Sequence, residues 1–374
     1  MIPYGKQTIG DDDFAAVAEV LRSDWLTTGP KVAEFERAVA EFCGVEHGVA
    51  ISNGTAALHA AMAAIGIGPG DEVIVPALTF VASANGVVYQ GGTPVFADVD
   101  PETLLVDPAS VAEKMTPRTR AVVAVDYAGQ PCDYDALQAL AGQRGIPLVA
   151  DACHSLGASY GDRMAGALAD LSAFSFHPVK PVTTGEGGMI VTSDAELARR
   201  MRVFRNHGIT TDFRQRESVG SWDYDMVSLG YNLRLSDLSC ALGISQLRKL
   251  PEWIERRNRI ATEYHKAFAG SEKIRPLAAA ADRTHGYHLF VVRVSCDRNE
   301  VFKKLRAAGI GVNVHYKPVY LHPFYRNKGY PEGLCPMAEK VFDSILSLPI
   351  YPRMTDAEIR EVVAGISEAV ATTA

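Results

Sequence analysis

The stretch SAFSFHPVKPVTTGEGGMIVT (residues 172–192) places two short apolar runs, SAFSF and GMIVT, on either side of a proline-containing turn. Upstream, further apolar runs alternate with helix-like stretches at 54–66, 80–90 and 133–144. These runs are GVAIS (48–52), EVIVP (72–76), TPVFADV (93–99), RAVVAV (120–125) and IPLVAD (146–151). Apolar runs that alternate with helices are typical of buried parallel strands, so we predict an α/β fold with a mainly parallel seven-stranded sheet and helices on both faces.

The remaining pattern is more helical and predicts a second, smaller domain. Helices are expected at 11–23, 31–43, 194–206, 236–269, 299–308 and 356–370, and one further strand, LFVVRV, at 289–294. At roughly 100–200 residues per domain, a chain of 374 residues is expected to hold two domains. We therefore predict a large domain over residues 1–245, which includes an N-terminal segment (1–45), and a smaller α+β domain over residues 246–374.

Composition and charge argue against several classes of protein. The chain has 37 Lys and Arg residues against 44 Asp and Glu residues, so it lacks the basic excess expected for nucleic-acid binding. Its six cysteines form no CxxC pair, which argues against a metal site and against a disulfide framework. No apolar stretch approaches the ~18 residues of a membrane helix and no secretory signal is visible, so we expect a cytoplasmic protein that does not bind membranes.

Lys180 is the most distinctive candidate for covalent chemistry. It follows an apolar run and lies between Pro178 and Pro181, which exclude a regular helix and restrict the backbone. A lysine presented by a rigid turn beside apolar residues can have a lowered pKa and act as a Schiff-base nucleophile. A solvated surface lysine is the alternative, and the rigid turn and the nearby Ser175 weigh against it without removing it.

Two polar residues, Asp151 and His154, follow the run IPLVA, at the strand end where ligands bind in open parallel sheets. A carboxylate at the end of a buried strand is costly unless it meets a positive partner, such as a protonated pyridine nitrogen, an arginine or a magnesium ion. Helix capping explains Asp151 equally well when it is considered alone. A structural hydrogen bond is the commoner role for a histidine such as His154.

The sequence Asn53-Gly54-Thr55-Ala56 follows the run GVAIS and begins an alanine-rich helix. Small residues at a helix start leave backbone N–H groups accessible at the positive end of the helix dipole, which suits a phosphate. An ordinary helix cap by Ser52 or Asn53 explains the same residues without a ligand.

Together these motifs resemble those of a known family. In order along the chain they are Asn-Gly-Thr-Ala (53–56), Asp-Ala-x-His (151–154), Ser-Phe-His-Pro-x-Lys (175–180), Gly-Glu-Gly-Gly (185–188) and Gly-Tyr-Asn-x-Arg (230–234). From residue 27 to residue 355 the chain is similar to the DegT/DnrJ/EryC1/StrS sugar-nucleotide aminotransferases. The resemblance implies the aspartate aminotransferase-like fold (type I) of the transferases that use pyridoxal 5′-phosphate (PLP) as cofactor.

The resemblance also implies which residues bind the cofactor. Lys180 would bind PLP covalently, and Asp151 would pair with the pyridine nitrogen and keep it protonated. Asn232 would reach the phosphate of a neighbouring subunit, so a homodimer with a shared active site is expected. The other implied contacts are the backbone of Gly54, Thr55 and Ala56 and the hydroxyl of Ser175 for the phosphate, His154 near the ring oxygen, and Phe80 on the ring face. Plain core packing is the alternative for Phe80.

The implied reaction moves the amino group of L-glutamate to a keto-sugar that is linked to a nucleotide. Lys180, once released from the cofactor, would move the proton between the substrate carbon and the cofactor carbon. A dehydrating branch of the family has histidine at the lysine position, whereas this chain has Lys180 there and His177 three residues earlier, which favours transamination. The rival of another class is a non-catalytic regulator with this fold, which would have no physical need for both Lys180 and Asp151.

Three segments, PYGKQTI (3–9), VDYAGQP (125–131) and FHPVKPVTTGEGG (176–188), are most similar to the subgroup that serves pseudaminic acid synthesis, and VNVHYKPVY (312–320) adds support. That likeness implies amination at C4 of UDP-2-acetamido-2,6-dideoxy-β-L-arabino-hex-4-ulose, with TDP-linked or 3-keto sugars as the alternatives. The implied substrate contacts are Tyr4, Asp24, Trp25, Leu26, Thr27, Arg234, Val314, His315, Tyr316 and Lys317. Cationic and aromatic side chains of this kind could meet the pyrophosphate and the rings, although surface or core roles fit each of them as well.

Overall fold

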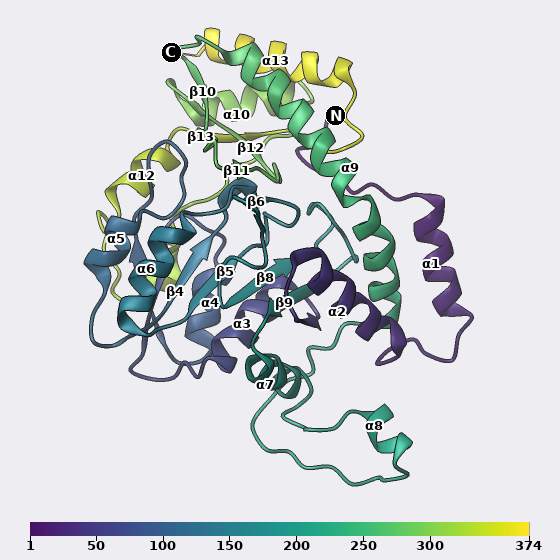
Figure 1. The fold of residues 1–374 in the computed structure, drawn as a ribbon. Coiled ribbons are helices and arrows are strands. Elements are labelled where there is room, and N and C mark those ends of the chain that lie inside the picture. The colour runs from purple at the N-terminus through teal and green to yellow at the C-terminus, as the bar shows by residue number, and fades with distance from the viewer. Residues whose placement is uncertain (374) are drawn as a thin grey trace.

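The computed structural model describes residues 1–373, with only the backbone of Phe213, and its largest unit is a seven-stranded sheet (Figure 1). In spatial order the strands are β1 (His47–Ile51), β9 (Gly188–Thr192), β8 (Leu171–Ser175), β5 (Leu148–Asp151), β4 (Thr119–Val125), β2 (Glu72–Pro76) and β3 (Thr93–Ala97). All run in one direction except β9, which pairs antiparallel with β1 and β8. The predicted sheet and each of its strands are confirmed.

Helices cover both faces of this sheet (Figure 1). α3 (Gly54–Ala64) packs against α4 (Ala82–Tyr89) and α7 (Ala195–Arg205). Both α1 (Asp11–Leu21) and α2 (Pro30–Cys43) pack against α9 (Asp237–Phe268). In addition, α5 (Pro108–Lys114) packs against α6 (Tyr134–Arg144). The central strands are buried along their whole length, which explains why they read as continuous apolar runs. Because parallel strands end at the same edge, the residues that follow β1, β2, β5 and β8 gather there.

A second hydrophobic core lies in the C-terminal part of the chain. It contains the antiparallel sheet β10 (Ile274–Pro276), β12 (Phe290–Val294) and β13 (Ile345–Leu348), with α10 (Arg298–Ala307) and α13 (Asp356–Ala371). Ile2 from the N-terminus is buried in this core as well. The predicted strand at 289–294 and the helices predicted at 299–308 and 356–370 are confirmed.

The predicted domain boundary, between residues 245 and 246, falls inside α9, which continues through Pro251 to Phe268. Further along the chain, seven residues between 319 and 345 pack into the core of the large sheet: Val319, Tyr320, Tyr325, Cys335, Ala338, Val341 and Ile345. The chain therefore returns to the large sheet after β12. The division into residues 1–245 and 246–374 stays a prediction.

The sequence pattern does not predict the shorter elements of the fold. Besides α5, β10 and β13, they are η1 (Tyr127–Gly129), β6 (Ser159–Tyr160), β7 (Arg163–Met164), α8 (Phe213–Ser218), β11 (Arg283–Thr284), η2 (Val319–Leu321), α11 (Pro323–Arg326) and α12 (Pro336–Phe342). β6 pairs with both β7 and β11, so this small sheet joins segments from before and after α9. A strand of two residues has no periodicity to read, because it is stabilised by backbone pairing with a distant segment.

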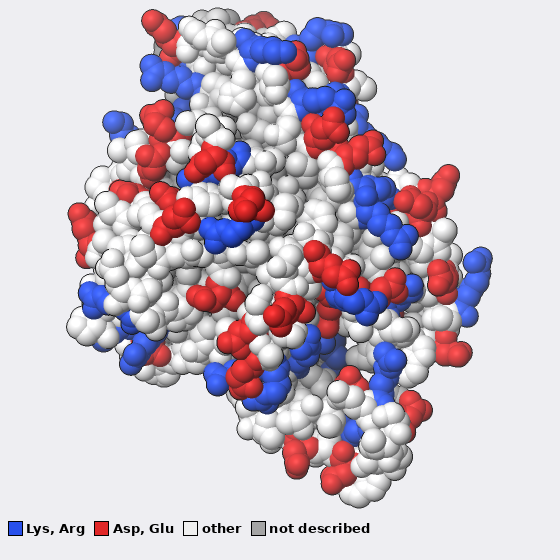
Figure 2. All heavy atoms as spheres, in the orientation of Figure 1, with Lys and Arg blue, Asp and Glu red and all other residues white. Residues whose placement is uncertain are grey.

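One segment, residues 210–231, projects from the body of the molecule and includes α8 (Figure 1). Six of its large apolar side chains are 54–87% exposed: Val219, Trp222, Tyr224, Met226, Val227 and Leu229. Figure 2 shows acidic and basic side chains interspersed over the face in view, without an extended patch of one sign. Within residues 1–373, none of the helices combines the length and the apolar character that a membrane crossing requires.

Candidate active site

Asp151 is the last residue of β5, and its carboxylate is buried at the edge where the parallel strands end. Ser83 Oγ on α4 donates a hydrogen bond to Asp151 Oδ2 (2.6 Å), and the Cys153 N–H donates to Oδ1 (3.3 Å). The chain after Asp151 turns without forming a helix, so helix capping does not explain this residue. Because both hydrogen-bond donors are neutral, a positively charged atom of a ligand would stabilise the buried carboxylate.

Lys180 lies in the turn between β8 and β9, as the prolines predict, and its N–H donates to the carbonyl oxygen of His177 (2.8 Å). The residue is half-buried. Burial lowers the pKa of Lys180, although the charges of Cys153 and Asp151 act in the opposite direction. A lysine amine with a lowered pKa is more often neutral and therefore nucleophilic, so the surface alternative is the weaker explanation of this residue.

The first turn of α3 lies against Ser175 at the end of β8. Asn53 caps this helix, because its side chain accepts a hydrogen bond from the Ala56 N–H (2.8 Å). A Cβ atom on Gly54 would lie 2.8 Å from the Ser175 Cβ, so only glycine allows this close approach. The start of α3 at Gly54 thus lies beside the Ser175 hydroxyl, in an arrangement that suits a phosphate. The Ala56 N–H, which was predicted to contact the phosphate, is already bonded to Asn53.

An aromatic ring and an imidazole lie next to these groups. Phe80 is 53% exposed, so core packing does not explain it, and its ring centroid lies 6.0 Å from that of Tyr316. His154 Nε2 lies 3.2 Å from the Tyr316 hydroxyl, whereas its buried Nδ1 has no hydrogen-bond partner within residues 1–373. Burial, and then the charge of Lys180, lowers the pKa of His154 well below its usual range. A neutral imidazole with one unpartnered nitrogen can form a hydrogen bond with a ligand oxygen.

Two residues of the site, Ser83 and His288, were not predicted. Ser83 donates a hydrogen bond to the Asp151 carboxylate. It follows Phe80 by one turn in the helix expected at 80–90, and this spacing could have indicated that Ser83 lies near the site. The His288 ring packs 4.4 Å from the His154 ring, and its Nδ1 is also buried without a partner in the described chain. No spacing in the sequence connects His288 with this edge, because it reaches the site from the segment before β12.

Three of the predicted substrate contacts, Tyr4, His315 and Tyr316, lie together beside His154. The ring centroids of Tyr4 and His315 are 5.5 Å apart, and those of His315 and Tyr316 are 4.9 Å apart. Burial raises the pKa of both tyrosines, so their hydroxyls stay protonated and can donate hydrogen bonds. They can therefore contact a substrate that is bound next to Lys180.

The other residues of segment 314–317 differ in what they offer to a ligand. His315 is buried, and both of its ring nitrogens have partners, the Ser347 hydroxyl (2.8 Å) and the Asn313 amide (3.2 Å). Burial lowers the pKa of His315 to about 3, so it is a neutral support for the segment. Val314 packs against both hydrophobic cores, whereas Lys317 is exposed where an anionic ligand can meet it.

The remaining predicted contacts, at 24–27 and Arg234, lie at a second place, beside the start of α9. The Leu26 carbonyl oxygen accepts a hydrogen bond from the Asp237 N–H (3.1 Å), and Thr27 pairs with Ser236. Asp24 and Leu26 are exposed, and Arg214 of the projecting segment lies 5.6 Å from the Trp25 ring centroid. Arg234 Nη1 donates to the Asn206 side-chain oxygen (2.9 Å).

Asn232 belongs to this second group, because it is exposed and its backbone pairs with that of Asn206. A cavity of about 370 Å³ lies here, and five arginines line it: Arg199, Arg202, Arg205, Arg214 and Arg234. The Leu233 carbonyl oxygen accepts from the Ser52 N–H (2.8 Å), so the segment runs beside the start of α3. Within one chain, the predicted cofactor residues therefore lie together, with the exception of Asn232. The predicted substrate residues lie in two separate groups.

Comparison with known proteins places this arrangement among its relatives. The sequence profile of the DegT/DnrJ/EryC1/StrS aminotransferase family matches residues 7–367. The chain is 41% identical over 377 aligned residues to the spore coat polysaccharide biosynthesis protein SpsC of Bacillus subtilis (strain 168), with 99% of this chain and 97% of that protein covered.

Two solved proteins have similar structures. Spr1654 from Streptococcus pneumoniae is 32% identical, with a TM-score of 0.95 in its PMP-form and 0.93 in its PLP-form. These comparisons cover 99% of this chain and 98–99% of that one. Helicobacter pylori PseC, an aminotransferase involved in the biosynthesis of pseudoaminic acid, is 30% identical, with a TM-score of 0.92 and 99% of both chains covered.

Proposed function

We propose that this chain, which belongs to the DegT/DnrJ/EryC1/StrS aminotransferase family, transfers the amino group of L-glutamate to a keto-sugar linked to a nucleotide. The observation that carries the proposal is the meeting of Asp151, Lys180 and the Gly54–Ser175 contact at one edge of the sheet. The cofactor is PLP. A sugar substrate is supported by the names of two similar proteins, since SpsC serves polysaccharide biosynthesis and PseC serves pseudoaminic acid biosynthesis.

The residues at the sheet edge fit PLP. The start of α3 at Gly54 and the Ser175 hydroxyl suit its phosphate, and the buried Asp151 suits a protonated ring nitrogen. The unpartnered His154 Nδ1 suits the ring oxygen, and the half-exposed Phe80 suits the ring face. When bound, PLP supplies an electron sink for the bond that breaks at the substrate carbon.

Lys180 has two tasks in this reaction. As a neutral amine, favoured by its lowered pKa, it binds the cofactor covalently. Once free, the same amine would remove the proton from the amino-bearing carbon of glutamate and would carry it to the carbon that PLP provides as its acceptor. In the second half-reaction it moves a proton in the opposite sense, onto the former keto carbon of the sugar. The Asp151 carboxylate would stabilise the positive ring nitrogen of the cofactor.

For the sugar we propose UDP-2-acetamido-2,6-dideoxy-β-L-arabino-hex-4-ulose, which would become UDP-4-amino-4,6-dideoxy-N-acetyl-β-L-altrosamine. The support is the likeness of segments 3–9, 125–131, 176–188 and 312–320 to the pseudaminic acid subgroup. Tyr4 and Tyr316 beside His154, and the exposed Lys317, would contact the nucleotide sugar. Identity to PseC (30%) is lower than to SpsC (41%), so the choice of sugar needs a direct test.

Absorption spectra of the PLP-loaded protein test both parts of the proposal. We expect a band of lysine-bound PLP that is lost on addition of glutamate and returns only with the UDP-linked L-arabino 4-ulose. Return of the band with a TDP-linked 4-keto-6-deoxy sugar would retain the aminotransferase and overturn the proposed sugar. A band that glutamate does not change would overturn glutamate as the donor, and a protein that never forms the band would point to the non-catalytic alternative.

We also propose a homodimer in which the projecting segment, residues 210–231, covers a second copy of the chain. An apolar surface of this kind, 54–87% exposed at six large side chains, is rare on monomers and marks an interaction site. The isologous contact of a twofold dimer would bury the same segment on both copies. In such a dimer Asn232 would reach the phosphate at the neighbouring subunit's cofactor site, as the family resemblance implies.

The double variant Trp222→Asp/Leu229→Asp is expected to weaken this dimer at least tenfold, because central apolar residues contribute most to the stability of an interface. Sedimentation velocity over a concentration series measures the dissociation constant. Ser218→Ala, an exposed polar position on α8, is the control and should leave the constant unchanged. A wild-type protein that sediments as a monomer, or a double variant as tight as the wild type, would contradict the proposed dimer.

A further inference from the structure

The first residues of the N-terminal segment (residues 2–10) are bound to the C-terminal core. The Ile2 N–H donates to the Gly309 carbonyl oxygen (2.8 Å), and the Ile2 carbonyl oxygen accepts from the Gly311 N–H (2.7 Å). The Tyr4 carbonyl oxygen accepts from the Ile350 N–H (3.1 Å). With the Ile2 side chain buried in the core, residues 2–4 have a defined position.

The middle of the segment passes beside the turn that carries Lys180. The Tyr4 ring packs against His315, and a Cβ atom on Gly5 would lie 3.6 Å from the Cβ of Val179, the residue before Lys180. In the described part of the chain, Gly5, Lys6 and Gln7 form no hydrogen bond to another residue. The position of this middle part is therefore set by what holds its two ends.

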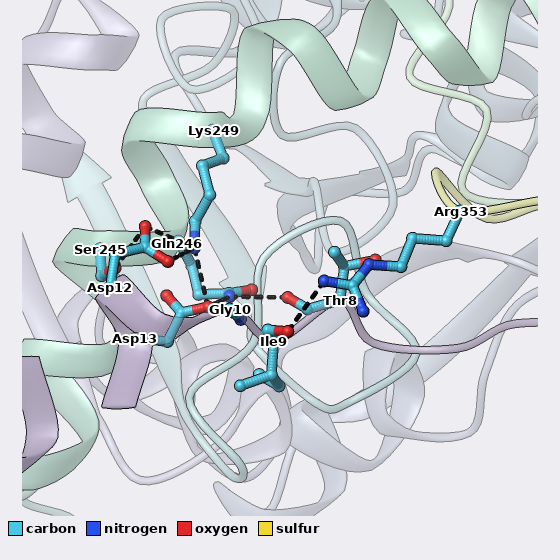
Figure 3. Close-up of polar contacts among 9 residues, drawn as sticks. All are labelled: Thr8, Ile9, Gly10, Asp12, Asp13, Ser245, Gln246, Lys249 and Arg353. Atoms are coloured by element: carbon cyan, nitrogen blue, oxygen red, sulfur yellow. Dashed lines mark hydrogen bonds and ion pairs between the residues drawn. The ribbon is translucent and has the colours of Figure 1, made fainter. Parts of the chain in front are cut away.

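The far end of the segment is anchored on α9 (Figure 3). Gln246 Nε2 donates to the Thr8 carbonyl oxygen (2.9 Å) and to Asp13 Oδ2 (2.8 Å), and both Gln246 and Asp13 are 1% exposed. Asp13 Oδ2 also accepts from the Gly10 N–H (2.9 Å) and from Lys249 Nζ (2.7 Å). Gln246 is thus the one side chain in this cluster that bonds both the segment and the buried carboxylate that caps α1.

A second contact supports the same stretch. Arg353 Nη2, from the exposed segment before α13, donates to the Ile9 carbonyl oxygen (2.9 Å). The segment is therefore held from α9 and from the C-terminal region at successive residues, Thr8 and Ile9 (Figure 3). Tyr4 is held on its N-terminal side by the bonds of residues 2–4, and the course of the chain on its C-terminal side depends on the contacts at Thr8 and Ile9.

We propose that Gln246 is a positioning residue, which acts through the N-terminal segment to hold Tyr4 where it meets the nucleotide sugar. The inference rests on the proposed function, in which Tyr4 contacts the sugar. Within residues 1–373 the hydrogen bonds of the Gln246 side chain go to Thr8 and Asp13 and not to Asp151 or Lys180, so we expect its replacement to affect the glutamate half-reaction less than the sugar half-reaction. The two half-reactions should accordingly respond differently when Gln246 is replaced.

The test is Gln246→Met, which preserves the length of the side chain and removes its hydrogen bonds. We expect KM for the keto-sugar to rise about tenfold, because Thr8 and Asp13 each lose a hydrogen bond and the segment that carries Tyr4 is held less firmly. The rate at which glutamate bleaches the lysine-bound PLP band should stay within twofold. Ser245→Ala is the matched control, because within residues 1–373 the hydroxyl of this neighbouring residue bonds Asp12 alone (3.4 Å), and it should leave both values unchanged.

Two further variants complete the experiment. Arg353→Met, at an exposed position, should raise KM for the sugar by a smaller factor than Gln246→Met does, and it should not change the glutamate bleaching rate. This variant allows the test if Gln246→Met does not fold. Tyr4→Phe should raise the same KM, and the double variant Tyr4→Phe/Gln246→Met should be no worse than the more severe single variant, because both act through one contact.

The outcomes separate the inference from the function on which it rests. The positioning role is overturned if Gln246→Met impairs the sugar KM and the glutamate bleaching rate by the same factor. It is also overturned if Gln246→Met leaves the sugar KM unchanged while Tyr4→Phe raises it. In both cases the proposed function stands. If Tyr4→Phe leaves the sugar KM unchanged, the Tyr4 contact and the inference fall together. A wild-type protein that aminates no keto-sugar overturns the proposed function, and this is seen before any variant is made.

Discussion

Lys180→Arg is expected to reduce turnover by about 10⁴-fold, the upper range for the loss of a positioned acid–base group. Arginine retains the positive charge and much of the length of lysine, but its guanidinium stays protonated and can neither bind the cofactor covalently nor accept a proton. The loss should therefore appear in kcat for both half-reactions. The measurement is product formation with glutamate and the keto-sugar, together with the absorption spectrum of the PLP-loaded protein.

Lys303→Ala is the matched control for this variant, because Lys303 is exposed and forms a surface ion pair with Glu300 (2.7 Å), one turn earlier in α10. It should leave both turnover and the spectrum unchanged. Unfolding temperatures of the PLP-free proteins should agree within a few degrees for wild type and both variants. Turnover by Lys180→Arg within tenfold of the wild type would show that another residue moves the proton.

Asp151→Asn is expected to lower kcat by about 10²- to 10³-fold, because breaking a buried charge pair costs about 3–5 kcal/mol. Asparagine has nearly the shape of aspartate but no charge, so it cannot keep the ring nitrogen of the cofactor protonated. The buried carboxylate receives its two hydrogen bonds from neutral groups, Ser83 and the Cys153 N–H, and neither could replace the missing charge. Single-turnover spectra with glutamate measure the effect on the chemical step.

Ser83→Ala gives a graded companion to Asp151→Asn. It removes the 2.6 Å hydrogen bond to Asp151 and retains the charge, so we expect a loss of about tenfold in kcat. Ser110→Ala removes a buried serine hydroxyl that bonds the Asp98 N–H (2.9 Å), and it controls for the general cost of such a change. Equal losses for Ser83→Ala and Asp151→Asn would contradict the view that the charge of Asp151 is the main contribution.

Much of the large sheet could be predicted from the sequence. The runs at 72–76 and 120–125 are largely apolar because β2 and β4 are inner parallel strands that are buried on both faces. The prolines around Lys180 predicted a non-helical turn for a local reason, the fixed backbone angle of proline, and the structure has that turn. Asp151 was placed at a strand end by its position directly after an apolar run.

Other parts of the site could not be predicted, because they depend on contacts between segments far apart in the chain. Gln246 looks like any polar residue of a helix, and only the packing of α1 against α9 buries it between Asp13 and Thr8. His288 likewise meets His154 only because the C-terminal region folds back over the sheet edge. The predicted substrate contacts looked like one set, but the fold places Tyr4 and Arg234 in different groups.

The sequence by itself determined the sheet, its flanking helices and the residues that end its strands, because apolar periodicity and backbone restriction act over a few neighbouring positions. The tertiary structure alone decided which polar groups are buried together. It set the lowered pKa of Lys180, the unpartnered nitrogen of His154 and the anchoring of the N-terminal segment. The physical reason is that desolvation and hydrogen-bond satisfaction depend on every group that surrounds an atom, and most of those groups are distant in the chain.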